Sequence, residues 1–196
     1  MDEHTLSYYN TNASSFAENT KTVLMTETWN YFTELIPQNG LILDFGCGAG
    51  RDTKFFLEQG YAVEAFDGSE VLCKIASVFT GIQVKQMLFC DFAEKNKYDG
   101  IWACSSILHI SKQKLSYVIK KIEKALKRNG IFYTSFKYGT FEGEREGRYF
   151  TDFTEETFEC FMQDISNLEI IKMWVSSDVR PKREHEKWLN VLLKKK

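Results

Sequence analysis

Long hydrophobic runs are missing from this sequence. Its 196 residues contain no stretch that approaches the roughly 18 apolar residues of a membrane span. The first residues, MDEHTLSYYN, are acidic and polar and lack the apolar core of a signal peptide. We therefore expect no membrane association and a cytoplasmic location.

Cysteine and histidine do not occur in disulfide or metal-binding patterns. The five cysteines are odd in number and include no C-x-x-C pair, and the three histidines include no H-x-x-x-H pair. The sequence predicts neither a disulfide framework nor a zinc site, and we expect no bound metal.

An excess of charge of one sign is also missing. The 25 Lys and Arg against 27 Asp and Glu give a net charge of −2, so the whole-molecule field that draws proteins onto nucleic-acid phosphate is absent. Nucleic acid is therefore an unfavoured partner. Two opposed blocks weaken this exclusion, since residues 101–140 are strongly basic and residues 141–179 strongly acidic.

The composition that is present fits one folded domain. Hydrophobic residues make up 43% and charged residues 27%, close to globular averages, and 196 residues is within the range of one domain. We expect a single domain over residues 1–196, as a monomer or a weak homodimer.

Short apolar runs separated by glycines predict a parallel sheet. The runs are too short for helices and lack clean alternation, as expected of strands buried on both faces. They span residues 41–45, 62–66, 82–87, 101–104 and 131–136. Because helical patterns lie between them, the predicted fold class is α/β.

The clearest helical pattern covers residues 112–128. Its apolar residues form one stripe at 3.6 spacing, with Ser111 as N-cap and Gly130 as stop. Further helices are expected over 22–35 and 155–165. After the last of these, two more strands are expected to form an antiparallel pair at the sheet edge, because the link between them is short and contains a proline. These strands span residues 168–175 and 188–193.

The most informative stretch is LDFGCGAGR, residues 43–51, where a strand ends in a glycine-rich loop ahead of a helix. Glycines let the backbone approach a ligand too closely for a Cβ, at the edge where such sheets bind ligands. The dinucleotide fingerprint G-x-G-x-x-G is not matched, since Arg51 stands where its third glycine belongs. Asp44, before the first glycine, would oppose a pyrophosphate but suits the ammonium and sulfonium of S-adenosylmethionine.

A second acidic motif supports an adenosine ligand. The next strand ends VEAFDGS, which places Asp67 seventeen positions after Gly50, where a carboxylate can accept both ribose hydroxyls. Each signal alone is weak, because a glycine turn is often only a tight joint and an Asp before Gly-Ser is often a helix cap. Together they predict S-adenosylmethionine as cofactor.

With these motifs the sequence resembles the class I S-adenosylmethionine-dependent methyltransferases over nearly its whole length. The motifs follow in the order LDFGCGAG, FDGS, YDGIWACSSILHI and NGIFYTSFKYG. A YYNTNA start and a GRDT continuation of the glycine loop are most similar to small bacterial methyltransferases of the tellurite-resistance and thiopurine type. The resemblance implies a Rossmann-like, doubly wound, seven-stranded, mostly parallel sheet with an antiparallel C-terminal hairpin.

The resemblance also implies a division of the chain and a set of cofactor residues. The expected parts are an N-terminal helical cap (1–40), a cofactor-binding core (41–137), a substrate lid (138–150) and a C-terminal helix with hairpin (151–196). The expected cofactor residues are Tyr9, Asp44, Gly46, Cys47, Gly48, Arg51, Asp67, Gly68, Ser69, Asp91, Phe92, Cys104 and Ser105. For Asp91 the alternative is an exposed loop carboxylate, and for Arg51 it is a surface pair with Asp52 or Glu64.

Catalysis by such an enzyme needs alignment more than acid–base chemistry, because the methyl group is already activated. If a base acts, His109 is the candidate, since it follows the fourth strand at the ligand edge and titrates near neutral pH. The alternative is a histidine that packs or caps at the start of the next helix.

Residues 137–150, KYGTFEGEREGRYF, have the composition of a mobile lid. Within it, Lys137 and Arg148 are candidates to bind a substrate anion. The expected substrate residues are Tyr8, Lys137, Tyr138, Arg148 and Tyr149. The alternative is a solvated loop that Phe150 pins to the body.

The acceptor is expected to be a small molecule. The fourth strand ends ACSSIL, without the [DN]PP[YF] motif that grips a flipped base, and no Pro-Cys pair is present for attack on cytosine. A peptide is the second possibility. Two other function classes remain, a sensor or scaffold that binds S-adenosylmethionine without turnover and an NAD-dependent oxidoreductase, which the misplaced third glycine disfavours.

Overall fold

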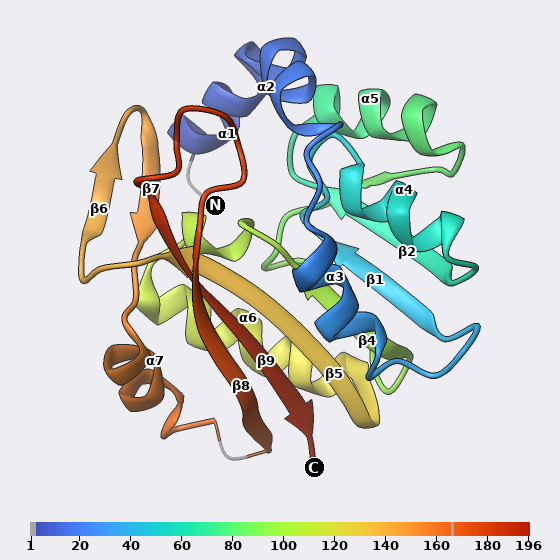
Figure 1. The fold of residues 1–196 in the computed structure, drawn as a ribbon, viewed down its shortest axis with the longest axis vertical. Coiled ribbons are helices and arrows are strands. Elements are labelled where there is room, and N and C mark those ends of the chain that lie inside the picture. The colour runs from blue at the N-terminus through green and yellow to red at the C-terminus, as the bar shows by residue number, and fades with distance from the viewer. Residues whose placement is uncertain (1–2, 166) are drawn as a thin grey trace.

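The computed structural model describes residues 3–165 and 167–196 and contains a seven-stranded sheet in the order β3-β2-β1-β4-β5-β9-β8 (Figure 1). The strands of this sheet are β1 (Leu41–Phe45), β2 (Ala62–Asp67), β3 (Lys85–Gln86), β4 (Tyr98–Ala103), β5 (Leu126–Lys137), β8 (Leu168–Ser177) and β9 (Lys187–Lys195). The helices are α1 (Glu3–Thr11), α2 (Ala13–Thr20), α3 (Thr26–Thr33), α4 (Arg51–Glu58), α5 (Glu70–Thr80), α6 (Lys112–Ala125), α7 (Glu155–Met162) and the short 3-10 helix η1 (Ile107–His109).

Helices cover both faces of this sheet, because neighbouring residues of a strand point to opposite sides. Ile101 of β4 packs in a core cluster with α6, whereas the next residue, Trp102, packs against Phe32 of α3 and Phe56 of α4. All four side chains are buried. The sheet thus separates two cores, as a doubly wound fold requires.

The C-terminal strands complete the sheet in the opposite direction. β1 to β5 pair in parallel, while β9 pairs antiparallel with both β5 and β8. The predicted α/β sheet, mostly parallel with an antiparallel C-terminal hairpin, is therefore confirmed. The hairpin brings the β8–β9 loop to the same end of the sheet as the glycine loop (Figure 1).

One expected helix end is wrong. The helix predicted over 112–128 ends at Ala125, and β5 begins with the next residue. The Lys97 amide donates to the Ala125 carbonyl, so the last turn is bonded to the loop before β4 and the chain passes straight into the sheet. Gly130, expected as the helix stop, lies inside the strand.

Three other expected elements are shorter than predicted. The helices over 22–35 and 155–165 shrink to α3 and α7, and the strand over 82–87 shrinks to the two residues of β3. β3 is an edge strand with one neighbour, so few ladder hydrogen bonds extend it.

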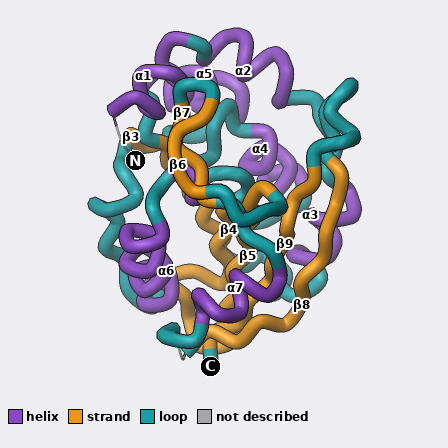
Figure 2. The backbone as a smooth tube through the Cα atoms, turned by 90° about the vertical axis from the view of Figure 1, so that its left-hand side faces the viewer, coloured by secondary structure: helices purple, strands orange, loops and turns teal. Residues whose placement is uncertain are grey.

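Most of the segment predicted as a substrate lid forms a β-hairpin. β6 (Glu142–Arg145) and β7 (Arg148–Thr151) form a separate two-stranded sheet, and Glu146 and Gly147 make its turn with positive φ angles of 51° and 73°. The hairpin stands at the same end of the molecule as α1 and α2 (Figure 2). The Tyr149 amide donates to the Thr5 hydroxyl at 3.0 Å, which joins β7 to α1.

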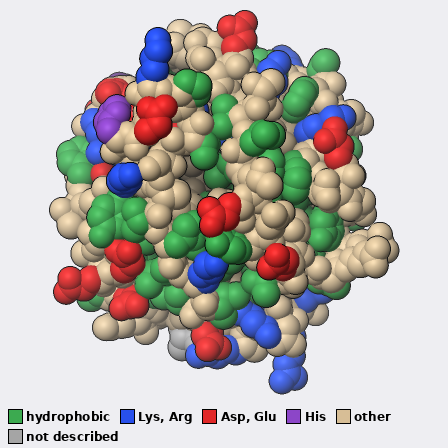
Figure 3. All heavy atoms as spheres, in the orientation of Figure 1, with side chains coloured by type: hydrophobic (Ala, Val, Ile, Leu, Met, Phe, Trp, Pro, Cys, Tyr) green, Lys and Arg blue, Asp and Glu red, His purple; other side chains and the backbone are tan. Residues whose placement is uncertain are grey.

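Charged side chains of both signs are interspersed on the face shown in Figure 3. Within residues 3–165 and 167–196, no helix is long and apolar enough to cross a membrane. The same described residues contain no cluster of three His, Cys, Asp or Glu side chains that could hold a metal ion.

Candidate active site

A cavity of about 840 Å³ opens at the carboxyl ends of the parallel strands, where α/β sheets bind ligands. Its walls come from the glycine loop after β1, the ends of β2, β4 and β5, the N-terminal helices, the β6–β7 hairpin and the β8–β9 loop. The predicted cofactor residues that line it are Tyr9, Gly46, Cys47, Gly48, Arg51, Asp67, Cys104 and Ser105. The predicted substrate and catalytic residues that line it are Lys137, Tyr138, Arg148 and His109.

The glycine loop is shaped by its backbone. Gly46 and Gly48 have φ angles of 84° and 56°, in the left-handed region that favours glycine. A Cβ on Gly46 would lie 2.6 Å from the Ser106 Cβ, and one on Gly48 would lie 3.0 Å from the Phe16 ring. Neighbouring side chains thus leave no room for a Cβ at these two positions, and both glycines line the cavity with backbone alone.

Asp67 ties this loop to the following one. Its carboxylate accepts the Gly48 amide at 2.9 Å and the Ser69 amide at 2.8 Å. Burial raises the pKa of Asp67, and the amide hydrogen bonds oppose that rise. A carboxylate has about four acceptor positions, so this cavity-lining residue still has capacity to accept hydroxyl groups of a ligand.

Asp44 lies beneath the loop rather than in the cavity wall. Its side chain is buried and accepts the Thr53 hydroxyl at 2.6 Å. Burial, reinforced by the negative charge of Asp52, raises the pKa of Asp44 to about 8. Its carboxyl group is thus largely protonated at neutral pH and serves the loop as a structural support.

Arg51 is paired with its neighbour Asp52, one of the two alternatives left open by the sequence. Its Nε and Nη2 atoms each donate to the Asp52 carboxylate at 2.8 Å. The same carboxylate accepts the indole N–H groups of Trp29 and Trp102, both at 2.9 Å. Burial would raise the pKa of Asp52, but these donors outweigh it and hold the pKa low. Glu64, the other proposed partner, bonds Lys97.

The end of β4 carries a strained serine. Ser105 has a φ angle of 52°, which is unfavourable for a non-glycine residue and typical of functional sites. Its amide donates to the Ser135 hydroxyl at 2.9 Å. Ser135 also lines the cavity but was not predicted, because it lies in the apolar strand β5 and no motif marks it. Beside them, burial raises the pKa of the Cys104 thiol to about 11, so it is neutral.

His109 is joined to α1 through Tyr9. The His109 Nδ1 atom lies 2.7 Å from the Tyr149 carbonyl oxygen, and its Nε2 atom lies 2.7 Å from the Tyr9 hydroxyl. A carbonyl oxygen only accepts, so Nδ1 carries a proton. In the neutral ring, Nε2 then accepts from the Tyr9 hydroxyl. The lone pair of the candidate base is therefore directed at Tyr9.

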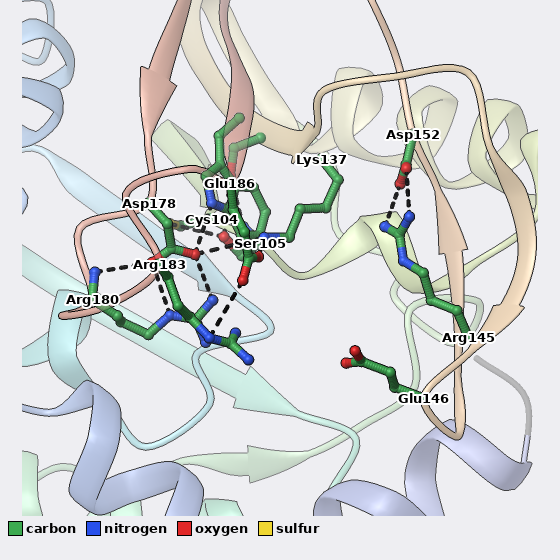
Figure 4. Close-up of polar contacts among 12 residues, drawn as sticks. Cys104, Ser105, Lys137, Arg145, Glu146, Asp152, Asp178, Arg180, Arg183 and Glu186 are labelled. Carbon is green, nitrogen blue, oxygen red and sulfur yellow. Dashed lines mark hydrogen bonds and ion pairs between the residues drawn. The ribbon is translucent and has the colours of Figure 1, made fainter.

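Paired charges wall the far end of the cavity (Figure 4). Lys137 forms ion pairs with Asp178 and Glu186, and its ammonium lies 4.0 Å from the centroid of the Trp188 ring. Asp178 also accepts two hydrogen bonds from the Arg180 guanidinium. Burial would raise the pKa of Asp178, but its donors hold it far below the ordinary range. Lys137, expected to bind a substrate anion, is therefore already neutralised.

Several predicted residues are not brought to the cavity wall. Asp91 is exposed, as its alternative interpretation expected, and Phe92 is buried in a core cluster with Phe45. Ser69 caps α5 by accepting the Leu72 amide. The others outside the wall are Asp44, Gly68, Tyr8 and Tyr149. The β8–β9 loop, which sequence reasoning did not include, supplies the missed cavity residues Asp178, Arg180, Arg183 and Glu186.

The central part of the chain matches a known family. Residues 42–130 match a family described as a methyltransferase domain. No curated protein matches the sequence. The resemblance drawn from the motifs is therefore confirmed for the part of the chain that holds the glycine loop and Asp67.

Solved structures extend the likeness of fold to nearly the whole chain. A 1,6-didemethyltoxoflavin-N1-methyltransferase from Burkholderia thailandensis, with its substrate and S-adenosylhomocysteine bound, is 19% identical with a TM-score of 0.78, covering 97% of this chain and 86% of its own. A TehB-like S-adenosylmethionine-dependent methyltransferase from Corynebacterium glutamicum is 17% identical with a TM-score of 0.72, covering 95% and 99%. The [4+2]-cyclase SpnF is 14% identical with a TM-score of 0.74, covering 96% and 94%.

Proposed function

We propose that this chain, a methyltransferase domain with the class I fold, transfers a methyl group from S-adenosylmethionine to a small-molecule acceptor. One observation carries the proposal: a single cavity runs from the glycine loop and Asp67 to the paired charges around Lys137. Two ligands can therefore meet inside it, the cofactor on the core sheet and the acceptor between the β6–β7 hairpin and the β8–β9 loop.

The residues at the first end fit S-adenosylmethionine. Gly46 and Gly48 line the cavity without side chains, and Asp67 has acceptor positions for the ribose hydroxyls. When bound, this cofactor would supply an electrophilic methyl group on a positively charged sulfur. Cys104 and Ser105, at the end of β4, are proposed to lie beneath its methionine part.

The protein's own contribution is alignment and exclusion of water. Tyr9 and Phe16 of the N-terminal helices line the cavity, and so do Arg145 and Arg148 of the neighbouring hairpin. If the acceptor releases a proton, His109 can receive it only through the Tyr9 hydroxyl, because that hydroxyl occupies Nε2. His109 is thus proposed as a base that acts through Tyr9.

Replacement of Asp67 tests cofactor binding. Asp67→Ala should weaken S-adenosylhomocysteine binding by at least about tenfold, since two hydrogen bonds to a charged acceptor are lost. Calorimetry measures the change. Glu64→Ala, which removes a carboxylate three residues earlier on β2, is the control and should leave the affinity unchanged. Equal affinities for wild type and Asp67→Ala would remove Asp67 from the site, and binding of NAD alone would overturn the proposed cofactor.

The second candidate is a sensor or scaffold that binds S-adenosylmethionine without turnover. The [4+2]-cyclase neighbour favours keeping it, because a chain of this fold can carry another activity. Release of S-adenosylhomocysteine in the presence of thiols, amines, carboxylic acids and chalcogen oxyanions separates the two. We also propose that the protein is bacterial and cytoplasmic, and that it works as a monomer or a weak homodimer.

A further inference from the structure

Three arginines that line the cavity each bond both oxygens of a neighbouring carboxylate. Arg51 and Arg180 each present the Nε and Nη2 edge of the guanidinium to both oxygens of a carboxylate, on Asp52 and Asp178. Arg145 bonds both oxygens of Asp152 through Nη1 and Nη2. Such bidentate pairs are the strongest arginine–carboxylate contacts. A ligand would have to break them to recruit these three residues.

Arg148 has the same Nε and Nη2 edge, but only one of these two atoms has a hydrogen-bond partner among the described residues, so the edge is half empty. Its Nη2 atom donates to the Glu146 carboxylate at 3.2 Å, while its Nε atom is buried and has no hydrogen-bond partner among the described residues. The Arg148 side chain is 15% exposed, whereas its partner Glu146 is 73% exposed. Water therefore screens the counter-ion much more than the cation, and the pair is weak.

Two aromatic rings hold the Arg148 guanidinium in place. The Tyr8 ring centroid lies 4.4 Å from its Cζ atom and the Phe150 ring centroid lies 5.1 Å away. Cation–π contacts of this kind orient the guanidinium without using its N–H groups. The same two rings contact the Tyr9–His109 pair, since Tyr8 packs against Tyr9 at 5.5 Å and Phe150 packs against His109 at 4.8 Å between ring centroids. Arg148 therefore lies near this pair.

We propose that Arg148 binds an acid group of the acceptor, a carboxylate or a comparable oxyanion, which takes the Nε and Nη2 edge and displaces Glu146. The inference rests on the proposed function and narrows its acceptor to anionic small molecules. Glu146 sits in the turn of the hairpin with its side chain mostly in solvent, so it can leave the edge without disturbing a packed core.

The methionine carboxylate of the cofactor has the same chemistry as an acceptor acid. Arg148 belongs to the β6–β7 hairpin, a sheet separate from the strands that carry the glycine loop and Asp67. A residue on this separate hairpin is suited to bind the acceptor rather than the cofactor. The experiment below separates the two sources.

Calorimetry and turnover should be measured with matched pairs of carboxylic acids and their primary amides, together with inorganic phosphate and selenite, on protein saturated with S-adenosylhomocysteine or S-adenosylmethionine. We expect at least one anion to bind and to be methylated, at least about tenfold better than its neutral partner. Arg148→Gln should lose that preference at least about tenfold, with less than twofold change in cofactor affinity. Glu146→Gln should improve anion binding about threefold, because the competing carboxylate is gone.

Arg128→Gln is the control. Arg128 is exposed near the end of β5 that lies away from the cavity, and its replacement changes the net charge by the same amount. Equal use of acids and amides, or the absence of any bound anion in a protein that binds S-adenosylhomocysteine, would overturn the inference and leave the cofactor proposal intact. A loss of cofactor affinity in Arg148→Gln with the anion preference unchanged would assign the edge to the cofactor instead. A wild type that binds no S-adenosylhomocysteine would overturn the proposed function itself.

Discussion

The two ends of the cavity are lined by different kinds of chemical group. At the cofactor end, glycines of the loop line the cavity, and the Asp67 carboxylate that contacts the loop is held by backbone amides. At the acceptor end, side-chain ion pairs form the wall, as around Asp178. Backbone geometry leaves a signature in sequence spacing, whereas ion pairs between distant segments do not. The difference explains why the cofactor is readable from the chain and the acceptor is not.

The sharpest contrast is between the carboxylates that anchor the two ends. Asp52→Ala should destabilise the fold by about 3–5 kcal/mol, because it leaves Arg51 and two indole N–H groups buried without a partner. Asp178→Ala should cost only about 1–2 kcal/mol, since Lys137 keeps Glu186 and Arg180 is 26% exposed.

Urea unfolding of the two variants gives the comparison. If Asp178→Ala cost as much as Asp52→Ala, the acceptor end would be as much a part of the folding core as the cofactor end, and the contrast would fail.

One added methyl group tests whether backbone geometry shapes the cofactor end of the cavity. Gly46→Ala should reduce S-adenosylhomocysteine affinity about a hundredfold, because a Cβ would lie 2.6 Å from the Ser106 Cβ in a residue with a φ angle of 84°. Gly60→Ala is a matched control, with a φ angle of 87° but nothing within 4 Å of the added Cβ. It carries the same backbone strain without the clash. Similar affinities for the two variants would show that the close approach of Gly46 to Ser106 does not determine binding.

The last expected effect concerns pH. The pKa of Asp44 is about 8 in the folded protein and near 3.8 when unperturbed, so the folded state binds the extra proton and stability falls as the pH rises between these values. Between pH 6 and pH 8 the wild type should lose about 2 kcal/mol relative to Asp44→Asn, which does not titrate. Urea unfolding at both pH values measures this loss. A wild-type stability that tracked the variant would mean that Asp44 is ionised in the fold.

The sequence was sufficient for the sheet because its signals are local. Short apolar runs, the glycine loop and the acidic motif each lie within a few residues, and their order determines the parallel sheet. The end of α6 was missed because its cause is not local: the loop before β4 bonds the last turn and pulls the chain into β5. Gly130 was read as a helix stop, although it lies in β5 with the Lys127 carbonyl 2.9 Å from where its Cβ would be.

The site divides in the same way. Glycines 46 and 48 and Asp67 could be placed from spacing alone. Ser135 and the residues of the β8–β9 loop could not, because only the antiparallel turn of the sheet brings them above the glycine loop. Lys137 and Arg148 looked equivalent in the sequence, and only their partners distinguish them.

The hydrogen bonds that join α1 to the β6–β7 hairpin and to His109 also affect the order in which the chain folds. Thr5 and Tyr149 are 144 residues apart, and Tyr9 and His109 are 100 apart. Contacts of such long range carry a large loop-closure entropy and form late in folding. During synthesis, α1 must wait for the hairpin to leave the ribosome before it can dock. β8 and β9 follow the hairpin in the chain, so a nascent chain can complete its sheet only after both parts of this enclosure have been made.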